Sequence, residues 1–467
     1  MEVILTILAL AASACVAMFS AQNAPLSHAI YMSGGTSAST VKLRDTDRVA
    51  YITPYKFGAL FSGVHPSFGR ELFRTAGTPA STWLLKDLWL GSNSSEPKTH
   101  RTATIGNAWD NAYRFATVRG RVVFRATNAA FGNALFASDG TKAGTIVLRN
   151  FKTAVGLRDV LAHTAQYALV IADDSIRGAS LWATDGTRAG TRFLMRERGI
   201  NESQKISAAA IGGNKIVFTQ DKGNTLWVTD GTGAGTIRIR EFPICALGSN
   251  DNHIKSMKGF PGRGFALFSG CTNFHGHELW RTDGTTTGTT LVRNIMRGPD
   301  SSEPAGFYAF KNDIVFAATS DTKGRELWTT QGTNATTRLV KDLWSGASSS
   351  SPIWFKRFGQ RVVFAAKVSG SQFPRLYSSD LTVAGTRRIG DTIVDSQFAN
   401  IGTKLVFGGR FASGSTGNEL MGTRGLVGTT HRISDIWPGT PSSEPMGITA
   451  VRINQDGFAT PEQCPPL

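Results

Sequence analysis

The stretch Glu278-Leu279-Trp280-Arg281-Thr282-Asp283-Gly284-Thr285-Thr286-Thr287-Gly288-Thr289 recurs with variations along most of this 467-residue chain. Its leucine and the residue that follows can be traced through eight copies, whose leucines are Leu72, Leu135, Leu181, Leu226, Leu279, Leu327, Leu376 and Leu420. The copies are 63, 46, 45, 53, 48, 49 and 44 residues apart. A period of ~48 residues fits a unit of four short strands, as in a propeller blade, and is too long for a leucine-rich repeat.

Within each unit, short apolar and β-branched runs alternate with Gly, Asn, Asp and Ser clusters, which is typical of strands. The sixth copy predicts strands over 306–310, 313–318, 326–330 and 337–342. Between strands 3 and 4, Asp-Gly-Thr-x-x-Gly-Thr predicts a tight hairpin turn, because Asp bonds nearby backbone and Gly accepts positive φ. The aromatic residue of strand 3 is expected to lie in the core.

The two ends of the chain predict ring closure. Residues 30–45 match strands 3 and 4 of a unit, and 446–460 match strands 1 and 2. Pairing of these half-units would leave no free sheet edge. The expected fold is therefore an all-β closed propeller of four-stranded blades. The repeat count gives nine blades, and eight is the alternative if a degenerate unit, such as the copy around Leu376, forms no blade.

An apolar run over 3–19, followed by small residues up to Ala24, is typical of a secretory signal peptide. We therefore expect residues 1–24 to be a signal peptide, residues 25–467 to form one propeller domain, and the protein to be secreted or extracytoplasmic. A retained anchor and lipidation at Cys15 are the alternatives. If the signal peptide is removed, Cys245, Cys271 and Cys464 remain in an oxidising compartment. Three cysteines cannot all pair within the chain, and a bridge between Cys245 and Cys271 is one possible arrangement.

The chain carries a formal net charge of +16. An anionic surface or an acidic glycan could be its partner, whereas no motif for reading nucleic acid is present. One basic residue per unit falls near the end of strand 4 in seven units, at Arg44, Lys86, Arg149, Arg196, Arg240, Arg293 and Lys341. Because strand 4 is outermost in a propeller, we expect these charges to form a solvated rim.

A second phrase follows strand 4 in four units, at residues 87–97, 294–304, 342–352 and 435–445, and contains Gly and then Ser-Ser-x-Pro. These crossing loops connect one blade to the next, and loops on a rigid scaffold often bind ligands. The predicted ligand-binding residues are the tryptophans as sugar-stacking platforms and Ser/Glu as polar partners: Trp89, Trp344, Trp437, Ser95, Glu96, Ser302, Glu303, Ser443 and Glu444. The competing interpretation is structural, with Ser satisfying backbone groups and Trp packing under the loop.

The sequence offers little support for catalysis or for a metal. No catalytic residue is predicted, because no phosphate loop, nucleophile elbow or paired-cysteine knuckle is present. Cys271-x-x-x-His275-x-His277 has no standard zinc spacing and is interpreted as a surface loop. Calcium at the Asp-Gly-Thr turns is not favoured, because each turn supplies one carboxylate, and Gln331 replaces the Asp in the sixth copy.

The two phrases, Glu-Leu-Trp-x-Thr-Asp-Gly-Thr-x-x-Gly-Thr and Ser-Ser-x-Pro, recur in register over 30–460. In this the chain resembles the ELWxxDGT repeat family of secreted bacterial proteins. The resemblance implies an extracytoplasmic repeat protein and no established activity. The turn is also similar to the Asp-box of sialidase-type propellers, although here Gly directly follows Asp, so a shared function is not inferred.

Three functions follow from these observations. The leading hypothesis is a secreted, monomeric, non-enzymatic scaffold without cofactors, whose loops bind carbohydrate, a cell surface or a protein. The second is a propeller-type glycan hydrolase or lyase, which requires acidic or His residues to converge near the axis. The third is a structural surface or adhesion component.

Overall fold

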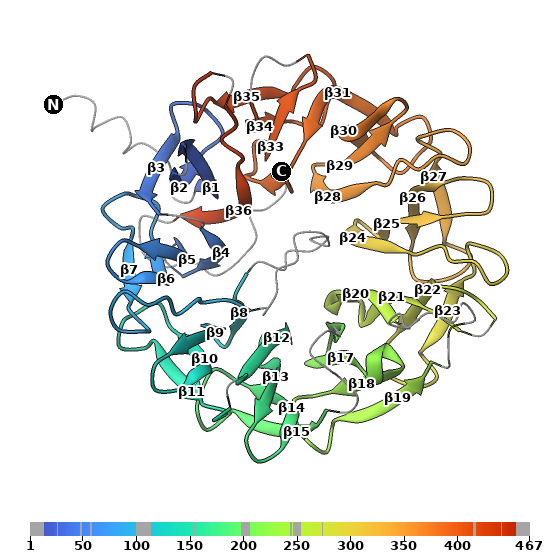
Figure 1. Ribbon diagram of the computed structural model, residues 1–467. Helices are drawn as coiled ribbons and strands as arrows, with labels where there is room; N and C mark the ends of the chain where they lie inside the picture. Colours follow the sequence, from blue (N-terminus) through green and yellow to red (C-terminus); the bar gives the residue numbers. More distant parts are fainter. Residues whose placement is uncertain are drawn as a thin grey trace.

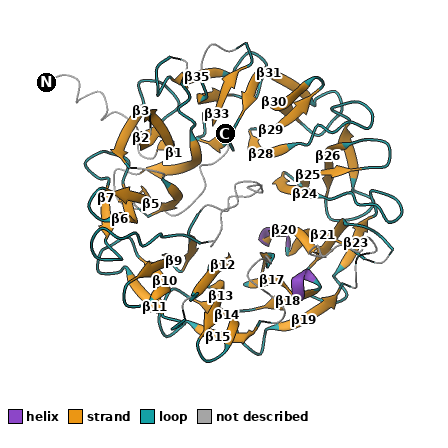
Figure 2. Ribbon diagram, in the orientation of Figure 1, coloured by secondary structure: helices purple, strands orange, loops and turns teal. Residues whose placement is uncertain are grey.

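The structure is a computed structural model that describes residues 14–25, 27–46, 49–56, 58–99, 114–153, 155–197, 206–242, 245, 254–272, 274–413, 417–439 and 441–453. Regular structure in these residues is almost entirely antiparallel β-sheet (Figure 2). The exceptions are the short 3-10 helices η3 (Asp221–Gly223) and η4 (Pro261–Arg263). The all-β prediction is confirmed.

Six of the described sheets each contain four strands that are consecutive in the chain. Their strands are β4 (Ala50–Tyr55), β5 (Gly58–His65), β6 (Gly69–Thr75) and β7 (Trp83–Lys86); β8 (Ala116–Val118), β9 (Arg121–Asn128), β10 (Gly132–Ser138) and β11 (Ile146–Arg149); β12 (Leu157–His163), β13 (Ala168–Asp174), β14 (Gly178–Thr184) and β15 (Arg192–Arg196); β16 (Ala208–Gly212), β17 (Lys215–Gln220), β18 (Thr225–Thr229) and β19 (Ile237–Glu241); β20 (Ile254–Phe260), β21 (Phe265–Gly270), β22 (Glu278–Thr282) and β23 (Thr290–Arg293); and β24 (Ala305–Phe310), β25 (Asp313–Thr319), β26 (Arg325–Thr330) and β27 (Arg338–Lys341). In the sixth copy, β24 to β27 match the predicted strands to within one residue at each end.

The copies around Leu376 and Leu420 share one eight-stranded sheet. Its strands are β28 (Ile353–Phe358), β29 (Arg361–Val368), β30 (Ser371–Ser379), β31 (Arg387–Val394), β32 (Ala399–Asn400), β33 (Leu405–Phe411), β34 (Glu419–Thr423) and β35 (His431–Ser434). The two units are joined where residues 392–394 of β31 pair with residues 409–411 of β33. The copy around Leu376 therefore forms four strands, although it is not separated from its neighbour as the other units are.

The last sheet joins the two ends of the chain, in the order β3-β2-β1-β36. Its strands are β1 (Ala14–Ala24), β2 (Ser27–Ser33), β3 (Thr40–Asp45) and β36 (Met446–Ile453). The sequence led us to expect two strands from each end, and this expectation is corrected: three strands come from the N-terminal segment and a single strand comes from the C-terminal segment. Residues 454–460, expected to complete strand 2, lie outside the described residues, and β1 occupies that position.

β1 falls within the predicted signal peptide, although it packs as an internal strand. Phe19 pairs with Tyr31 as Phe316 pairs with Trp328 in the sixth copy. Val16 to Ala21 are buried, and Cys15 is disulfide-bonded; Cys464 lies outside the described residues. An apolar run of this length serves a signal peptide and a buried strand equally well, so the sequence did not distinguish them. Cleavage after Ala24 stays a prediction, and it would remove β1.

The sheets are arranged around a common centre, with the first strand of each unit innermost and the fourth outermost (Figure 1). Within the described residues, nine hydrophobic clusters each lie between two consecutive repeat units. Alternate residues of a strand face opposite sides of its sheet, so Leu60 packs against the following unit and Phe61 against the preceding one. The strand-3 aromatic residues are buried as predicted, except Trp227, which is half-buried.

The Asp-Gly-Thr turn closes strands 3 and 4 of a unit, as predicted. In the fifth copy Asp283 Oδ1 accepts hydrogen bonds from the Thr285 amide at 2.9 Å and hydroxyl at 2.7 Å. Gly284 has φ +87°, and a Cβ at Gly288 would lie about 2.0 Å from the Asp283 carboxylate. The second glycine of the phrase is therefore required by the close approach of the Asp.

Candidate functional site in the crossing loops

The four crossing loops are anchored by the glutamate that opens the repeated phrase in the same unit. These glutamates are the buried residues Glu71, Glu278, Glu326 and Glu419 on β6, β22, β26 and β34. Each carboxylate accepts backbone N–H bonds from the residues 17 and 24 positions later, and a hydroxyl bond from the second Ser of Ser-Ser-x-Pro. We call this arrangement the Glu–Ser clamp.

The clamp in the last unit shows the geometry. Glu419 Oε2 accepts the Ile436 amide at 2.8 Å and the Ser443 hydroxyl at 2.7 Å, while Oε1 accepts the Ser443 amide at 3.0 Å. The first serine also contributes, because Ser442 Oγ accepts the Asn418 amide at 2.9 Å. Both ends of the crossing loop are thereby fixed to strand 3.

Burial changes the protonation of these carboxylates. It raises the pKa of Glu71 and Glu278 to about 7, although the hydrogen bonds from Ser and backbone amides lower it. The pKa values of Glu326 and Glu419 are raised for the same reason. Structural networks shift pKa values as catalytic sites do, and all four clamp carboxylates are engaged by hydrogen bonds from their own crossing loops.

Sequence reasoning did not connect the two phrases, although a signal was present. The four units with Glu before the Leu are the same four that carry the crossing-loop phrase. The remaining units have Ala29, Ala134, Ser180, Thr225 and Arg375 at that position and lack the phrase. This correlation inside a single chain could have predicted that the Glu and the Ser-Ser pair are in contact.

The structure places the predicted ligand-binding residues in three different environments. Ser95, Ser302 and Ser443 are fully buried in the clamps, so their hydroxyls are not available to a ligand and the structural interpretation holds for them. Trp89, Trp344 and Trp437 are half-buried on the loops.

The third environment is that of the glutamates that follow the serines. Glu96 and Glu303 lie 3.7 Å and 3.3 Å from Arg70 and Lys255, respectively, while Glu444 is exposed. All three have positive φ, between 45° and 51°. Of the predicted residues, the tryptophans and glutamates therefore remain as candidates for ligand contact.

The basic residues at the ends of strand 4 do more than form a solvated rim. Five of them donate to the carbonyl oxygen of the threonine that ends the turn in the next unit, at 2.5 to 3.1 Å: Arg44 to Thr82, Lys86 to Thr145, Arg240 to Thr289, Arg293 to Thr337 and Lys341 to Thr386. Arg149 instead stacks over Trp182, with its guanidinium carbon 3.9 Å from the ring centroid. Much of the predicted rim charge thus links neighbouring units.

The Cys–His segment is not the surface loop that we expected. Cys271 and His277 are buried, and Cys271 forms a disulfide with Cys245. His275 is half-buried, and its Nδ1 lies 3.2 Å from the Asn294 side-chain nitrogen. Among the described residues, Cys245, Cys271 and His277 form the one group of three His, Cys, Asp or Glu side chains with ligand atoms within 4.8 Å of one another.

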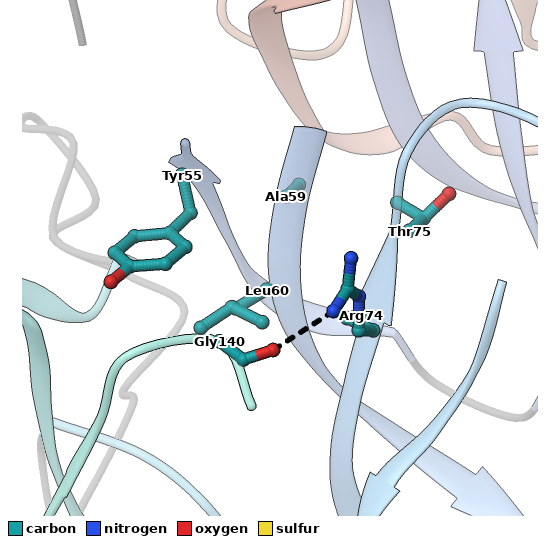
Figure 3. Close-up of a pocket in the computed structure, with 6 residues that line it drawn as sticks. All are labelled: Tyr55, Ala59, Leu60, Arg74, Thr75 and Gly140. Carbon is teal, nitrogen blue, oxygen red and sulfur yellow. Dashed lines mark hydrogen bonds between the residues drawn. The ribbon is translucent and has the colours of Figure 1, made fainter. Parts of the chain in front are cut away.

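A small hollow between the first two sheets after β3 offers no ligand site of useful size (Figure 3). It lies beside Tyr55, Leu60 and Gly140, and Arg74 donates to the Gly140 carbonyl at 3.0 Å across it. The volume open to the centre of a water molecule is about 10 Å³, which is room for about one water. Among the described residues, no helix has the length and apolar character needed to cross a membrane.

Comparisons with known proteins give fold likenesses only. No family model matches the sequence, and no curated protein matches it significantly. Puromycin hydrolase aligns with a TM-score of 0.36 and 13% identity over 70% of this chain and 53% of that chain. A prolyl endopeptidase structure gives a TM-score of 0.41 and 9% identity over 68% and 48%. An oligogalacturonate lyase in complex with manganese gives 0.34 and 15% over 67% and 84%.

The chain spans about half the length of the first two of these proteins. At these scores and identities, the likenesses carry no argument about activity or ligand.

Proposed function

We propose that this chain is a secreted, non-enzymatic β-propeller scaffold whose crossing loops bind carbohydrate, a cell surface or a protein. The proposal includes a closed ring of nine blades, one of them shared by the two ends of the chain, and this ring requires that β1 is not removed by cleavage after Ala24. The direct pairing of β1 with β36 supports closure. So do the clusters between consecutive units, because one of them packs β1 and β2 against β33 and β34.

The observation that carries the binding proposal is the Glu–Ser clamp. It holds four loops at both ends, so the side chains on those loops are positioned before any ligand arrives. Binding to a preorganised surface costs less entropy than binding to one that must be ordered. Trp89, Trp344 and Trp437 lie on three of these loops and are half-buried, and the exposed part of each side chain is proposed to stack on the apolar face of a sugar.

Net charge favours an anionic ligand among carbohydrates. The chain carries +16, and a basic surface attracts acidic glycans over distances set by the ionic strength. Several cations of the rim are engaged in hydrogen bonds between neighbouring units. We therefore expect the long-range electrostatic attraction to bring an acidic ligand to the protein, and the crossing loops to make the direct contacts with it.

The test is an array of neutral and acidic oligosaccharides, probed with the protein and with a variant in which Trp89, Trp344 and Trp437 are replaced by Ala. Trp83→Ala is the matched control, because Trp83 is exposed on an outer strand and contacts Arg74 rather than a crossing loop. We expect the triple variant to lose the bound glycans and the control to keep them, with unchanged circular dichroism in both. Equal binding by the triple variant would contradict the proposal.

Two further measurements separate the alternatives. A glycan hydrolase or lyase would release products from a bound oligosaccharide, which mass spectrometry would detect. A structural surface component would self-associate, and light scattering would then show oligomers instead of the monomer that we propose.

A further inference from the structure

Three residues that the repeat does not dictate converge on one place in the fold. Cys245 follows β19 on the crossing to the next sheet, Cys271 follows β21, and His277 precedes β22. Their two sulfur atoms and an imidazole nitrogen lie within 4.8 Å of one another. All three residues are at least 97% buried. The residues directly before the glutamate in the other clamped units are Arg70, Arg325 and Asn418, so His277 is particular to this unit.

The backbone of His277 is fixed by the clamp of its own unit. Its amide donates to Ser301 Oγ at 2.9 Å, and its carbonyl accepts the Glu303 amide at 3.0 Å. The two cysteines are held at a Cα–Cα distance of 5.5 Å. The clamp thus sets the backbone position of His277, and Cys271 directly follows β21.

The distances suit a metal ion when the sulfurs are not bonded to each other. Zinc binds thiolate sulfur at about 2.3 Å and imidazole nitrogen at about 2.0–2.1 Å in tetrahedral geometry. Neighbouring ligand atoms are then about 3.5–3.8 Å apart, so the two sulfur atoms must move apart from their bonded position, while the imidazole nitrogen already lies within 4.8 Å of both. Two sulfurs and an imidazole select zinc over the hard cations Mg²⁺ and Ca²⁺, which prefer oxygen.

We propose that Cys245, Cys271 and His277 form a Zn²⁺ site when the Cys245–Cys271 disulfide is reduced. A dithiol reductant breaks the sulfur–sulfur bond, gives two thiols on the protein and becomes a disulfide itself. Zn²⁺ then displaces one proton from each thiol, and the neutral imidazole donates its nitrogen lone pair. A water molecule takes the fourth position. The same two segments are tied by a covalent bond in the oxidised protein and by the metal in the reduced protein.

Cobalt(II) is the probe, because it replaces zinc in such sites and its thiolate complexes absorb in the near-ultraviolet and visible ranges. The full chain is kept in dithiol reductant, the reductant is removed without air, and alkylation with mass mapping confirms that both thiols are free. We expect about one cobalt per chain with tetrahedral visible bands, displaced by added Zn²⁺. The oxidised chain should show none of these bands.

Two histidine variants make the test specific. His277→Gln should weaken cobalt binding by about tenfold or more, since loss of even an outer-sphere partner commonly costs that much. His275→Gln is the matched control, two residues away and outside the group, and should bind as the unchanged chain does. Protein in which mass mapping finds the Cys245 and Cys271 thiols free, but which shows no cobalt bands, would overturn the proposal. Equal affinity in His277→Gln would overturn it as well, and this variant leaves the disulfide available for folding.

Discussion

Replacing Glu419 by Gln tests whether the clamp holds the last crossing loop. The amide nitrogen of Gln must replace either Oε1 or Oε2, and both oxygens accept backbone amides. At Oε1 it would face the Ser443 amide; at Oε2 it would face the Ile436 amide, while the Ser443 hydroxyl could turn to accept. In either orientation one buried N–H loses its acceptor. We therefore expect a cost of about 1–3 kcal/mol.

Hydrogen exchange of the loop is the most direct assay, because a protein built of many sheets need not unfold in a single step. A loss of 1–3 kcal/mol corresponds to a roughly 5- to 150-fold faster exchange of the amides in residues 436–443 when exchange follows the equilibrium of local loop opening. Glu444→Gln is the matched control, since Glu444 lies on the same loop and is exposed. We expect its effect to stay within about 0.5 kcal/mol.

A double-mutant cycle with Ser443→Ala identifies the contact itself. If the carboxylate and the hydroxyl interact as their 2.7 Å separation indicates, the two changes should be non-additive by about 0.5–3 kcal/mol. Additive effects, or loop exchange in Glu419→Gln no faster than in Glu444→Gln, would refute the clamp as the anchor of the crossing loop.

Two further predictions concern the ends of the chain and its pH dependence. Removal of residues 1–24 should destabilise the fold by about 5–9 kcal/mol, because Val16, Met18 and Phe19 are buried and each contributes about 1.5–3 kcal/mol. The assay compares the thermal unfolding of residues 25–467 with that of residues 14–467. Equal unfolding temperatures would contradict the role of β1. Because the folded-state pKa of Glu71 and Glu278 is raised from 4.5 to about 7, the stability that these carboxyls contribute should be fully present below pH 4.5 and be lost as the pH rises towards 7. The measurement is the free energy of unfolding in urea, for the unchanged chain and for the double variant Glu71→Gln/Glu278→Gln, at pH 5 and at pH 8. The difference between the two proteins should be smaller at pH 8 than at pH 5. A difference that grows with pH would contradict this prediction.

Local chemistry explains why much of the fold could be predicted. In the sixth copy the apolar runs, the Gly and the turn Asp lie next to the strands that they specify, so β24 to β27 follow the predicted ranges. The same holds for the Asp283 turn, whose hydrogen bonds span two residues. Interactions of this range appear in the sequence as a pattern, because every partner lies within the same repeat.

Prediction was weaker where one pattern serves two purposes. The apolar segment that includes Phe19 is compatible with a signal peptide, and its place as an internal strand depends on β2 and β36 standing on either side. Ser95, Ser302 and Ser443 were expected to contact ligands because they lie in loops, yet each is buried against a glutamate. The sequence of a loop identifies the groups that can form hydrogen bonds, but it does not identify their partners in the folded protein.

The sequence by itself determined the repeat, the four-stranded unit, the hairpin turns and the buried strand-3 aromatics, because periodic burial and turn formation depend on near neighbours. Only the tertiary structure decided which residues complete the sheet shared by the chain ends, since Ala17 and Ala450 meet across more than four hundred residues. It also decided that Glu419 and Ser443 are partners and that Cys245, Cys271 and His277 lie together. Such contacts depend on how loops and sheets pack in space, and no local periodicity specifies them.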